Sequence, residues 1–373
     1  MQLTDIETPA LVVDRSRLAH NIERMRRRLA ELGVPLRPHV KTAKSADIVR
    51  LAVEGQPGGI TVSTLREAEH FLEAGFTDIL YAVGIAPSKL AHVAALQRRG
   101  ADLTIILDSV EMAEAAAREA EALGTVFPVL IELDTDGGRA GVAAGDGPRL
   151  VEIGRILDAA PGTDLRGVMT HAGLSYGCRS PEALRAHAEQ ERSGAVGAAE
   201  ALRAAGLAAP VVSIGSTPGA LFAERLDGVT EVRAGVYMFM DLVMADLGVC
   251  AEEEIALSVL ATVIGHRPDR GYLLLDAGGL ALSKDAGPAR DKPSYGSLWD
   301  SATGLPLGLG IASTNQEHGL VPAGEADLAR LPIGSQVRIA PNHACMTAAA
   351  HDRYHVVEGG TEVRAVWERC NGW

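Results

Sequence analysis

Strand-like and helix-like runs alternate through the first two thirds of the chain, and this alternation limits the possible folds more than any other feature. Segments rich in Ala, Glu, Arg and Leu separate short apolar runs that are typical of buried strands. About eight such units over roughly 220 residues predict a (β/α)8 barrel of the TIM type. The expected strands lie at residues 36–42, 59–62, 79–82, 103–107, 128–133, 167–170, 211–214 and 231–233. A doubly wound open sheet is the alternative, but no Gly-x-Gly-x-x-Gly motif follows the first strand.

The pattern changes after about residue 250, where helical periodicity becomes weak. Strand-like runs at 259–264, 272–276 and 337–341 are joined by turn residues and Gly-rich loops, which predicts a mostly β region. A further strand is expected near residues 9–14, and it could belong to either part of the chain. We therefore expect two domains. The first is a barrel that spans residues 15–250, and the second is a β-rich domain formed by residues 1–14 and 251–373.

Composition excludes several classes of function. A net charge of −13 argues against non-specific nucleic-acid binding, and 4% aromatic residues argue against a stacking platform for single strands. The sequence contains no apolar run of about 18 residues, so we expect no membrane-spanning helix. The N-terminus lacks the basic and then apolar layout of a signal peptide. The four scattered cysteines do not form a disulfide framework, so we expect a reduced, cytoplasmic protein.

Lys41 ends the first expected barrel strand, in the run Leu36–Thr42. In a TIM-type barrel the carboxyl end of a strand lies at the rim where active sites are built. A lysine amine that is partly withdrawn from water can form a Schiff base or transfer a proton. The alternative is a strand-end lysine whose side chain reaches solvent.

Two glycine-containing turns follow the expected seventh and eighth strands, at Gly215–Gly219 and Arg233–Tyr237. Loops at these positions of a barrel often bind phosphate through backbone N–H groups. Ser216, Thr217 and Tyr237 add hydroxyl donors, although ordinary turns would also explain the glycines. A phosphate site and a lysine on one rim suggest pyridoxal 5′-phosphate (PLP), with the lysine bound to its aldehyde.

The loops after the fifth and sixth expected strands carry further candidates. Arg139, in the Gly-rich run Asp134–Gly141, could reach the pyridine nitrogen of the cofactor and keep it unprotonated. A solvated arginine is the alternative, and a calcium loop is disfavoured because the later ligands are missing. His171 lies where a general acid or base would be placed, unless it is a hydrogen-bonded structural histidine. Tyr176 could flank the cofactor.

His343 and Cys345 lie two residues apart in the β-rich region. In a strand, such residues point to the same face and could share one metal ion. A single His-x-Cys pair is weak evidence for a metal site when it is taken alone. Gln316 and His318 occur in a polar, Gly-terminated segment and could line the same cavity.

Six short motifs occur in order: Arg37–Thr42, His171–Gly173, Gly215–Pro218, Val232–Tyr237, Asn315–Gly319 and Pro341–Cys345. Together they resemble the D-threonine aldolase/D-serine dehydratase family. These are fold-type III PLP enzymes, built like alanine racemase and expected to form homodimers. The resemblance runs from about Thr8 to Trp373.

This resemblance implies a role for each matching residue. Lys41 would form the Schiff base with PLP and take the Cα proton, and Arg139 would face the pyridine nitrogen. His171 corresponds to the base that deprotonates the β-hydroxyl in the aldolases. His343 and Cys345 would bind a divalent metal that contacts this hydroxyl. The phosphate would be held by Ser216, Thr217, Gly235 and Tyr237.

The metal is not determined by these residues. Thiolate and imidazole ligands favour zinc. Hydroxyaspartate dehydratases are nevertheless associated with harder ions, so manganese, magnesium and cobalt also remain candidates.

The resemblance implies dehydration of a β-hydroxy D-amino acid, because Cys345 stands where the aldolases carry aspartate. The first expected reaction converts D-threo-3-hydroxyaspartate to oxaloacetate and ammonia, and D-serine or D-threonine are the next expected substrates. The alternative is a D-threonine or 3-hydroxy-D-aspartate aldolase. A non-enzymatic PLP-carrier protein is disfavoured because that class lacks a second domain. An amino-acid racemase would use a catalytic tyrosine of the partner subunit, which we cannot place here.

Overall fold

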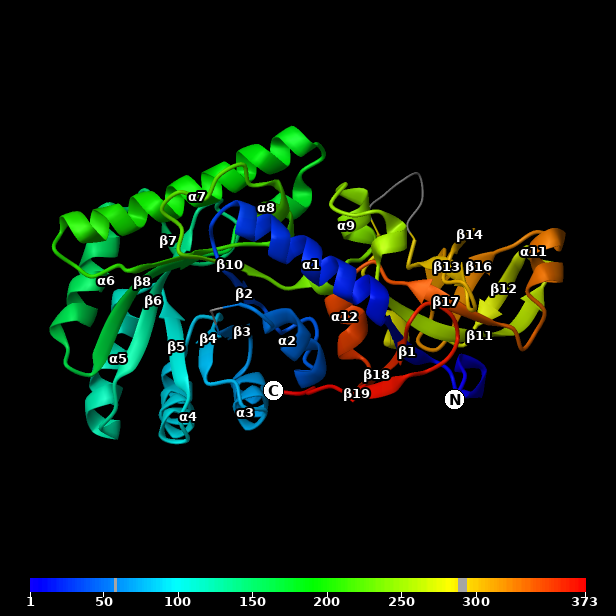
Figure 1. Cartoon of the computed structure of the whole chain (residues 1–373), viewed down its shortest axis with the longest axis horizontal. Coiled ribbons are helices and arrows are strands. Elements are labelled where there is room, and N and C mark those ends of the chain that lie inside the picture. The colour runs from blue at the N-terminus through cyan, green and yellow to red at the C-terminus, as the bar shows by residue number, and fades with distance from the viewer. Residues whose placement is uncertain (57–58, 288–293) are drawn as a thin grey trace. The chain divides into compact units, whose positions relative to one another are not determined.

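The computed structural model describes residues 1–56, 59–287 and 294–373 (Figure 1). The described chain divides into two compact units. Residues 25–235 with 372–373 form one of them, which we call the barrel unit. Residues 1–24 and 236–371 form the other, the β-rich unit. Helix α1 (Arg15–Glu31) runs from the second unit into the first.

Eight parallel strands of the described chain form a nearly closed barrel, in the order β2-β10-β9-β8-β6-β5-β4-β3. A parallel bridge between His39 and Thr61 links the segment after β2 to β3. All eight strands correspond to predicted runs, so the prediction of a (β/α)8 barrel is confirmed. The strands are β2 (Leu36–Pro38), β3 (Ile60–Val62), β4 (Asp78–Tyr81), β5 (Asp102–Leu107), β6 (Phe127–Asp134), β8 (Thr163–Thr170), β9 (Val211–Ile214) and β10 (Glu231–Ala234), with the short β7 (Val142–Ala143) paired to β6.

Helices surround these strands (Figure 1). Because helices cover the outside and side chains fill the inside, β5 is buried at every position from Leu103 to Leu107. Hydroxyl side chains begin several helices: Thr64, Ser109 and Ser180 each accept a backbone N–H of the first turn. The helices are α2 (Ala46–Val53), α3 (Leu65–Glu73), α4 (Pro87–Arg98), α5 (Val110–Leu123), α6 (Gly147–Ala159), α7 (Pro181–Ala204) and α8 (Thr217–Phe222), with a 3-10 turn η2 (Gly173–Gly177) before α7.

The β-rich unit contains a mostly antiparallel sheet with the path β14-β13-β17-β11-β1-β18-β19. The predicted mostly β region is therefore confirmed. Its strands are β1 (Ala10–Asp14), β11 (Leu257–Arg267), β12 (Tyr272–Leu275), β13 (Ser297–Asp300), β14 (Pro306–Gly310), β15 (Ser313–Thr314), β16 (Gly319–Pro322), β17 (Gln336–Ala340), β18 (Arg353–Val357) and β19 (Ala365–Glu368). Short helices lie between them: η1 (Leu3–Asp5), η3 (Val236–Met238), α9 (Leu242–Asp246), η4 (Glu252–Glu254), α10 (Gly279–Leu282), α11 (Glu325–Arg330) and α12 (Ala344–Ala349).

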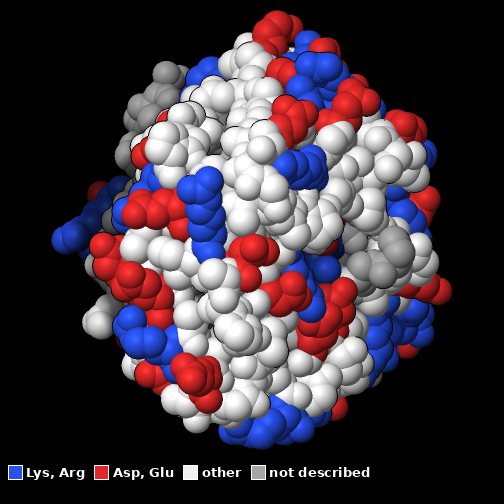
Figure 2. All heavy atoms as spheres, turned by 90° about the vertical axis from the view of Figure 1, so that its left-hand side faces the viewer, with Lys and Arg blue, Asp and Glu red and all other residues white. Residues whose placement is uncertain are grey.

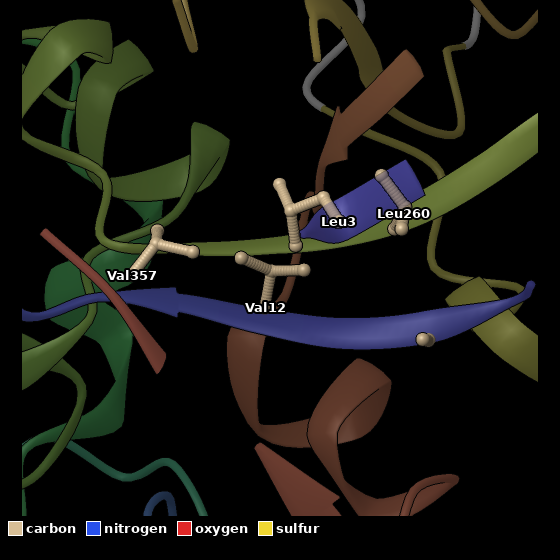
Figure 3. Packing of buried hydrophobic residues seen from close by; sticks show 5 residues of the cluster. Leu3, Val12, Leu260 and Val357 are labelled. Atoms are coloured by element: carbon tan, nitrogen blue, oxygen red, sulfur yellow. The ribbon is translucent and has the colours of Figure 1, made fainter. Parts of the chain in front are cut away.

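The first strand, β1, lies in the middle of the β-rich sheet. It pairs antiparallel with β11 and parallel with β18. Leu3, Val12, Leu260 and Val357 pack together as a buried apolar cluster on this strand (Figure 3). Burial of such side chains stabilises each by roughly 1.5–3 kcal/mol, so the N-terminal segment is a structural part of this unit.

The described surface shows charges of both signs. Basic and acidic side chains are interspersed on the face of the barrel unit seen in Figure 2. Ion pairs account for part of this mixture, as where Arg166 contacts both Asp102 and Asp164. Among the described helices, none combines the length and the apolar character needed to cross a bilayer.

Candidate active site

The candidate residues of the barrel unit follow strands that are neighbours in the barrel. Lys41 follows β2, Gly235 follows β10, Ser216 follows β9, His171 follows β8 and Arg139 follows β6. These five strands are consecutive in the order β2-β10-β9-β8-β6. Because carboxyl ends of parallel strands meet at one rim, the topology gathers these residues along one side of that rim.

Lys41 lies three residues beyond the last residue of β2, not at the end of the strand as predicted. The chain leaves the strand at Pro38, and the next two amides bond to the strands on either side. His39 N–H donates to the Ala234 carbonyl, and Val40 N–H donates to the Thr61 carbonyl, both at 2.8 Å. Lys41 is consequently the first residue of the turn beyond these bonds, and it is partly buried.

The turn that carries Lys41 is held from the other side by Lys44. Lys44 adopts a left-handed backbone conformation with φ +47°. Its ammonium lies 3.1 Å from Oε1 of Glu67, which is a buried side chain of α3. The Ser63 N–H donates to the other carboxylate oxygen of Glu67 at 2.8 Å. The ion pair therefore ties the Lys41 turn to the loop after β3.

His171 is held in a defined orientation and is neutral. Its Nδ1 lies 2.9 Å from the Gly215 carbonyl, so Nδ1 carries the proton and Nε2 is left as a proton acceptor. The pKa of His171 is lowered to about 4, chiefly by burial; the Gly215 bond opposes this shift, and the positive charges of Lys41, Arg139 and Arg233 add to it. The predicted Lys41, Arg139 and His171 therefore lie near one another.

Arg139 is exposed on a loop that acidic side chains hold in shape. Asp134 Oδ1 accepts the N–H groups of Asp136, Gly137 and Gly138 at 2.6–3.3 Å. Asp136 in turn accepts the Leu174 N–H at 2.8 Å, which joins this loop to the loop of His171. These carboxylates are thus occupied by backbone amides, as expected of a structured loop.

The backbone of Gly173 lies beside the guanidinium of Arg139 and the neutral imidazole of His171. A Cβ at this residue would lie 3.7 Å from Nη2 of Arg139 and 3.9 Å from Nε2 of His171. The ring of Tyr176 is tilted by 50° against the ring of His171, with 6.4 Å between their centroids. Tyr176 therefore flanks the imidazole.

The two glycine turns follow the neighbouring strands β9 and β10, and the second turn packs against the segment that carries Lys41. A Cβ on Gly235 would lie 2.8 Å from the His39 carbonyl oxygen and 3.1 Å from Oγ1 of Thr42, so only glycine fits there. The buried side chain of Ser216 accepts the Gly219 N–H at 3.0 Å at the start of α8. Hydroxyls, backbone amides and a close glycine approach fit the phosphate of a cofactor.

The other two predicted phosphate ligands are also buried. Thr217 is the first residue of α8, directly after Ser216. Tyr237 follows Gly235 by two residues and lies in η3, with its side chain fully buried. Tyr237 belongs to the β-rich unit, whereas Thr217 belongs to the barrel unit.

Sequence reasoning gave no role to three buried or partly buried residues near this rim. Arg233 donates to Oγ of Ser213 and to the Thr170 carbonyl, each at 2.5 Å. Burial, together with Lys41, Arg233 and His171, lowers the pKa of His39 well below its ordinary value. His39 and Arg233 were inside motifs already singled out. The third residue, Glu191, could have been noticed because it interrupts the apolar stripe of α7.

Arg37, also within the first motif, has a structural role. It points toward the amino ends of the strands, where it lines a cavity of about 110 Å³. Its guanidinium contacts Asp78 at 2.9 Å and Glu231 at 2.7 Å. Burial lowers the pKa of Arg37, but these two carboxylates outweigh it and raise the pKa above its ordinary value. Arg37 therefore cross-links β2, β4 and β10 away from the rim.

His343 and Cys345 are close together, but the predicted strand geometry is wrong. Strand β17 ends at Ala340, His343 precedes α12, and Cys345 lies in its first turn. Cys345 hydrogen-bonds the imidazole, and Asp285 Oδ2 accepts from Nδ1 at 2.7 Å. The Cys345 bond, the Asp285 bond and the charge of Asp241 raise the pKa of His343 to about 9, against the effect of burial.

This pair fits a metal ion by its chemistry. Nitrogen and sulfur donors lie together, and a carboxylate on the second ring nitrogen is the usual outer partner of a metal-bound histidine. Within the residues that the structure describes, no group of three or more His, Cys, Asp or Glu side chains gathers as a metal site.

Gln316 and His318 lie in the exposed turn between β15 and β16 of the same unit. The turn packs closely against Gly278, where a Cβ would lie 2.4 Å from the Gln316 carbonyl and 2.5 Å from the His318 nitrogen. The Leu280 N–H donates to the Gln316 carbonyl at 3.0 Å. The segment is therefore fixed by its backbone, with both side chains exposed.

Two family models match the sequence on either side of residue 250. Residues 13–243 match the model described as alanine racemase, N-terminal domain. The chain belongs to this family. Residues 256–357 match the model of a putative serine dehydratase domain.

Relatives within this family match the chain over its full length. A D-threo-3-hydroxyaspartate dehydratase of Delftia sp. (strain HT23) is 53% identical, with 100% of this chain and 99% of the relative covered. A solved structure of a dehydratase of this name, a cysteine-to-alanine mutant in the metal-free form, has a TM-score of 0.96 and 52% identity over 100% of both chains. The D-threonine aldolase from Filomicrobium marinum has a TM-score of 0.85 and 27% identity, covering 99% of this chain and 97% of its own.

Proposed function

We propose that this protein is a dehydratase that converts D-threo-3-hydroxyaspartate to oxaloacetate and ammonia with the help of PLP and a divalent metal. The observation that carries the proposal is the full-length similarity to a D-threo-3-hydroxyaspartate dehydratase, at 53% identity. D-Serine and D-threonine are the next candidate substrates. We also predict a homodimer and a cytoplasmic location. Light scattering of the purified protein tests the oligomeric state.

The barrel unit offers all but one, Tyr237, of the residues that would hold PLP. Lys41 would bind its aldehyde carbon, Arg139 would face its ring nitrogen, and Ser216, Thr217, Gly235 and Tyr237 would hold its phosphate. When bound, PLP supplies an electron sink for the Cα of the substrate. Lys41 would remove the Cα proton, and its position in the turn just beyond the backbone bonds of His39 and Val40 supports this role.

The β-rich unit offers the residues that would hold the metal. The His343 imidazole and the Cys345 sulfur would be its protein ligands, with Asp285 orienting the imidazole. A divalent ion supplies Lewis acidity to a leaving hydroxyl. Sulfur and nitrogen donors favour zinc, while manganese, magnesium and cobalt remain candidates.

One observation favours a second candidate function, a D-threonine or 3-hydroxy-D-aspartate aldolase. His171 is neutral with Nε2 as a proton acceptor, which is the form needed to take the proton of a β-hydroxyl. Removal of that proton drives Cα–Cβ cleavage, whereas dehydration needs the hydroxyl to leave. We expect His171→Asn to slow the cleavage reaction more than the elimination, and equal losses would leave His171 without this role.

Product analysis separates the two functions. With D-threonine, a dehydratase yields 2-oxobutyrate and ammonia, and an aldolase yields glycine and acetaldehyde. With D-threo-3-hydroxyaspartate, the corresponding products are oxaloacetate and ammonia, or glycine and glyoxylate. Glycine as the main product from both substrates would overturn the dehydratase proposal. The absence of turnover with every substrate, despite bound PLP, would instead support a non-enzymatic carrier.

A further inference from the structure

A buried carboxylate in the barrel unit has no role in the proposed reaction. Glu191 lies on α7, and its exposed fraction is only 2%. It occupies the buried stripe of this helix, between Ala188 and Ala195. Burial of a carboxylate is costly unless hydrogen bonds or positive charges compensate it. The contacts of Glu191 therefore show what it is retained for.

One oxygen of Glu191 joins two loops of the candidate site. Oε1 accepts the N–H of Ala172 at 3.0 Å and the N–H of Gly215 at 3.2 Å. Ala172 directly follows His171, and Gly215 directly precedes Ser216. The carboxylate therefore fixes the loop after β8 relative to the loop after β9.

Gly215 extends this connection to the imidazole. Its N–H donates to Glu191, while its carbonyl accepts from Nδ1 of His171 at 2.9 Å. Gly215 has a φ of +138°, and a Cβ there would lie 2.2 Å from the Arg233 carbonyl oxygen. Only glycine fits at this position. Its amide is held by Glu191, and its carbonyl selects the tautomer of His171.

Helix α8 also approaches the same carboxylate. A Cβ on Gly219 would lie 3.1 Å from Oε2 of Glu191 and 3.0 Å from Oγ of Ser216. Ser216 Oγ lies 3.4 Å from Oγ of Ser175, a residue of the His171 loop. Glu191 is consequently packed between the start of α8 and the segment that carries the imidazole.

We propose that Glu191 is a positioning residue that keeps His171 in the Nδ1–H tautomer and holds the Ser216 loop in its phosphate-binding shape. Its effect on catalysis rests on the roles proposed above for His171 and Ser216. The tautomer itself is a property of the protein chain and does not depend on those roles. A merely structural role would stabilise α7 without any effect on the imidazole.

The tautomer can be read directly by ¹⁵N NMR of the histidine ring nitrogens, in the full-length protein with and without PLP. His171→Asn identifies the signal. We expect wild type and Glu191→Gln to show the Nδ1–H form at neutral pH, because glutamine keeps an oxygen that accepts both amides. In Glu191→Ala both tautomers should appear, since the Gly215 backbone is no longer held.

Cofactor affinity gives a second readout. Two buried amides lose their acceptor in Glu191→Ala, so we expect the dissociation constant of PLP to rise by about ten- to hundredfold. Glu191→Gln should stay within a few-fold of wild type. Glu189→Ala is the matched control, because Glu189 lies on the same helix and its carboxylate pairs with two arginines, the buried Arg192 and the exposed Arg225.

Glu191→Asp keeps the proposal testable if the alanine variant does not fold. Aspartate retains the charge but is one methylene too short to reach both amides, so it should behave as the alanine variant does. An unchanged tautomer and unchanged PLP affinity in Glu191→Asp would overturn the proposal, as would a mixed tautomer in Glu191→Gln. A protein that binds no PLP but shows the expected tautomers would refute the proposed cofactor and leave the role of Glu191 standing.

Discussion

Lys41 is the residue on which the cofactor proposal depends. It is partly buried in the turn beyond β2, where its charge acts on His39 and His171. We expect Lys41→Ala to abolish turnover and the visible absorbance of lysine-bound PLP, because the amine that would hold the cofactor is gone. Absorption spectra after incubation with PLP and dialysis measure this.

The control for this variant is another lysine of the barrel unit. Lys89 is exposed and donates to the Tyr81 hydroxyl at 3.0 Å. Lys89→Ala should therefore keep both the absorbance and the turnover. If the spectrum of Lys41→Ala matched that of wild type, Lys41 would have to be removed from the site.

The imidazole of His171 links stability to pH. Its pKa is lowered to about 4 from an ordinary value of 6.5, chiefly by burial. Above pH 6.5 it is neutral whether the chain is folded or unfolded. As the pH falls toward 4 the unfolded chain binds the proton first, so the stability that neutral His171 contributes is lost over this range.

Substitution of His171 removes this part of the pH dependence. Between about pH 7 and about pH 4.5, wild type should lose roughly 2 kcal/mol more of its unfolding free energy than His171→Asn loses. Urea unfolding of both proteins at the two pH values provides the comparison. Equal losses would mean that the imidazole is not protected from protonation in the folded protein.

At the scale of elements, α7 matters because it carries Glu191. Ser180 begins the helix by accepting the Ala183 N–H at 3.2 Å. We expect Ser180→Ala to destabilise the barrel unit by about 1 kcal/mol, since an N–H of the first turn loses its acceptor. Ser193→Ala, inside the same helix, is the matched control and should have little effect because alanine suits a helix interior. Denaturation midpoints compare the two, and a smaller loss for Ser180→Ala than for the control would refute this account of the cap.

The elements of the barrel could be predicted because burial on both sides leaves a continuous apolar run. Strand β5 is an example, since each residue from Leu103 to Leu107 is buried. The place of Lys41 was predicted only to within a few residues. Strand β2 ends early because the amides of His39 and Val40 bond to different neighbours, Ala234 and Thr61, and both partners are distant in sequence.

The segment of His343 and Cys345 could not be predicted in the same way. Alternation suggested a strand, but the chain enters α12 after His343. Asp241 fixes the start of this helix, because its Oδ2 accepts the Ala344 N–H at 3.0 Å. The two residues are 103 positions apart in the sequence. Sequence spacing carries no information on such a contact. Glu191 shows the same limit, since its place on a buried stripe was visible while its partners, Ala172 and Gly215, were not.

At the scale of the whole molecule, the candidate groups divide between the two units. Lys41, Arg139 and Ser216 belong to the barrel unit, whereas His343 and Cys345 belong to the β-rich unit. The expected cofactor and metal therefore have mostly separate protein ligands. Loss of one should leave the other largely in place.

Metal removal tests this division. Chelation with EDTA should abolish turnover while the absorbance of bound PLP persists, because Lys41 and the Ser216 loop do not depend on the metal. His343→Ala should have the same effect without a chelator, since a single cysteine binds a divalent ion poorly. His266→Ala is the control, because His266 bonds the Leu331 carbonyl at 2.8 Å in the same unit and lies outside the proposed metal pair. Metal analysis should confirm that the EDTA-treated protein is metal-free. Full turnover in that protein would rule out the metal role of His343 and Cys345. Recovery of turnover on adding zinc, manganese, magnesium or cobalt would identify the ion.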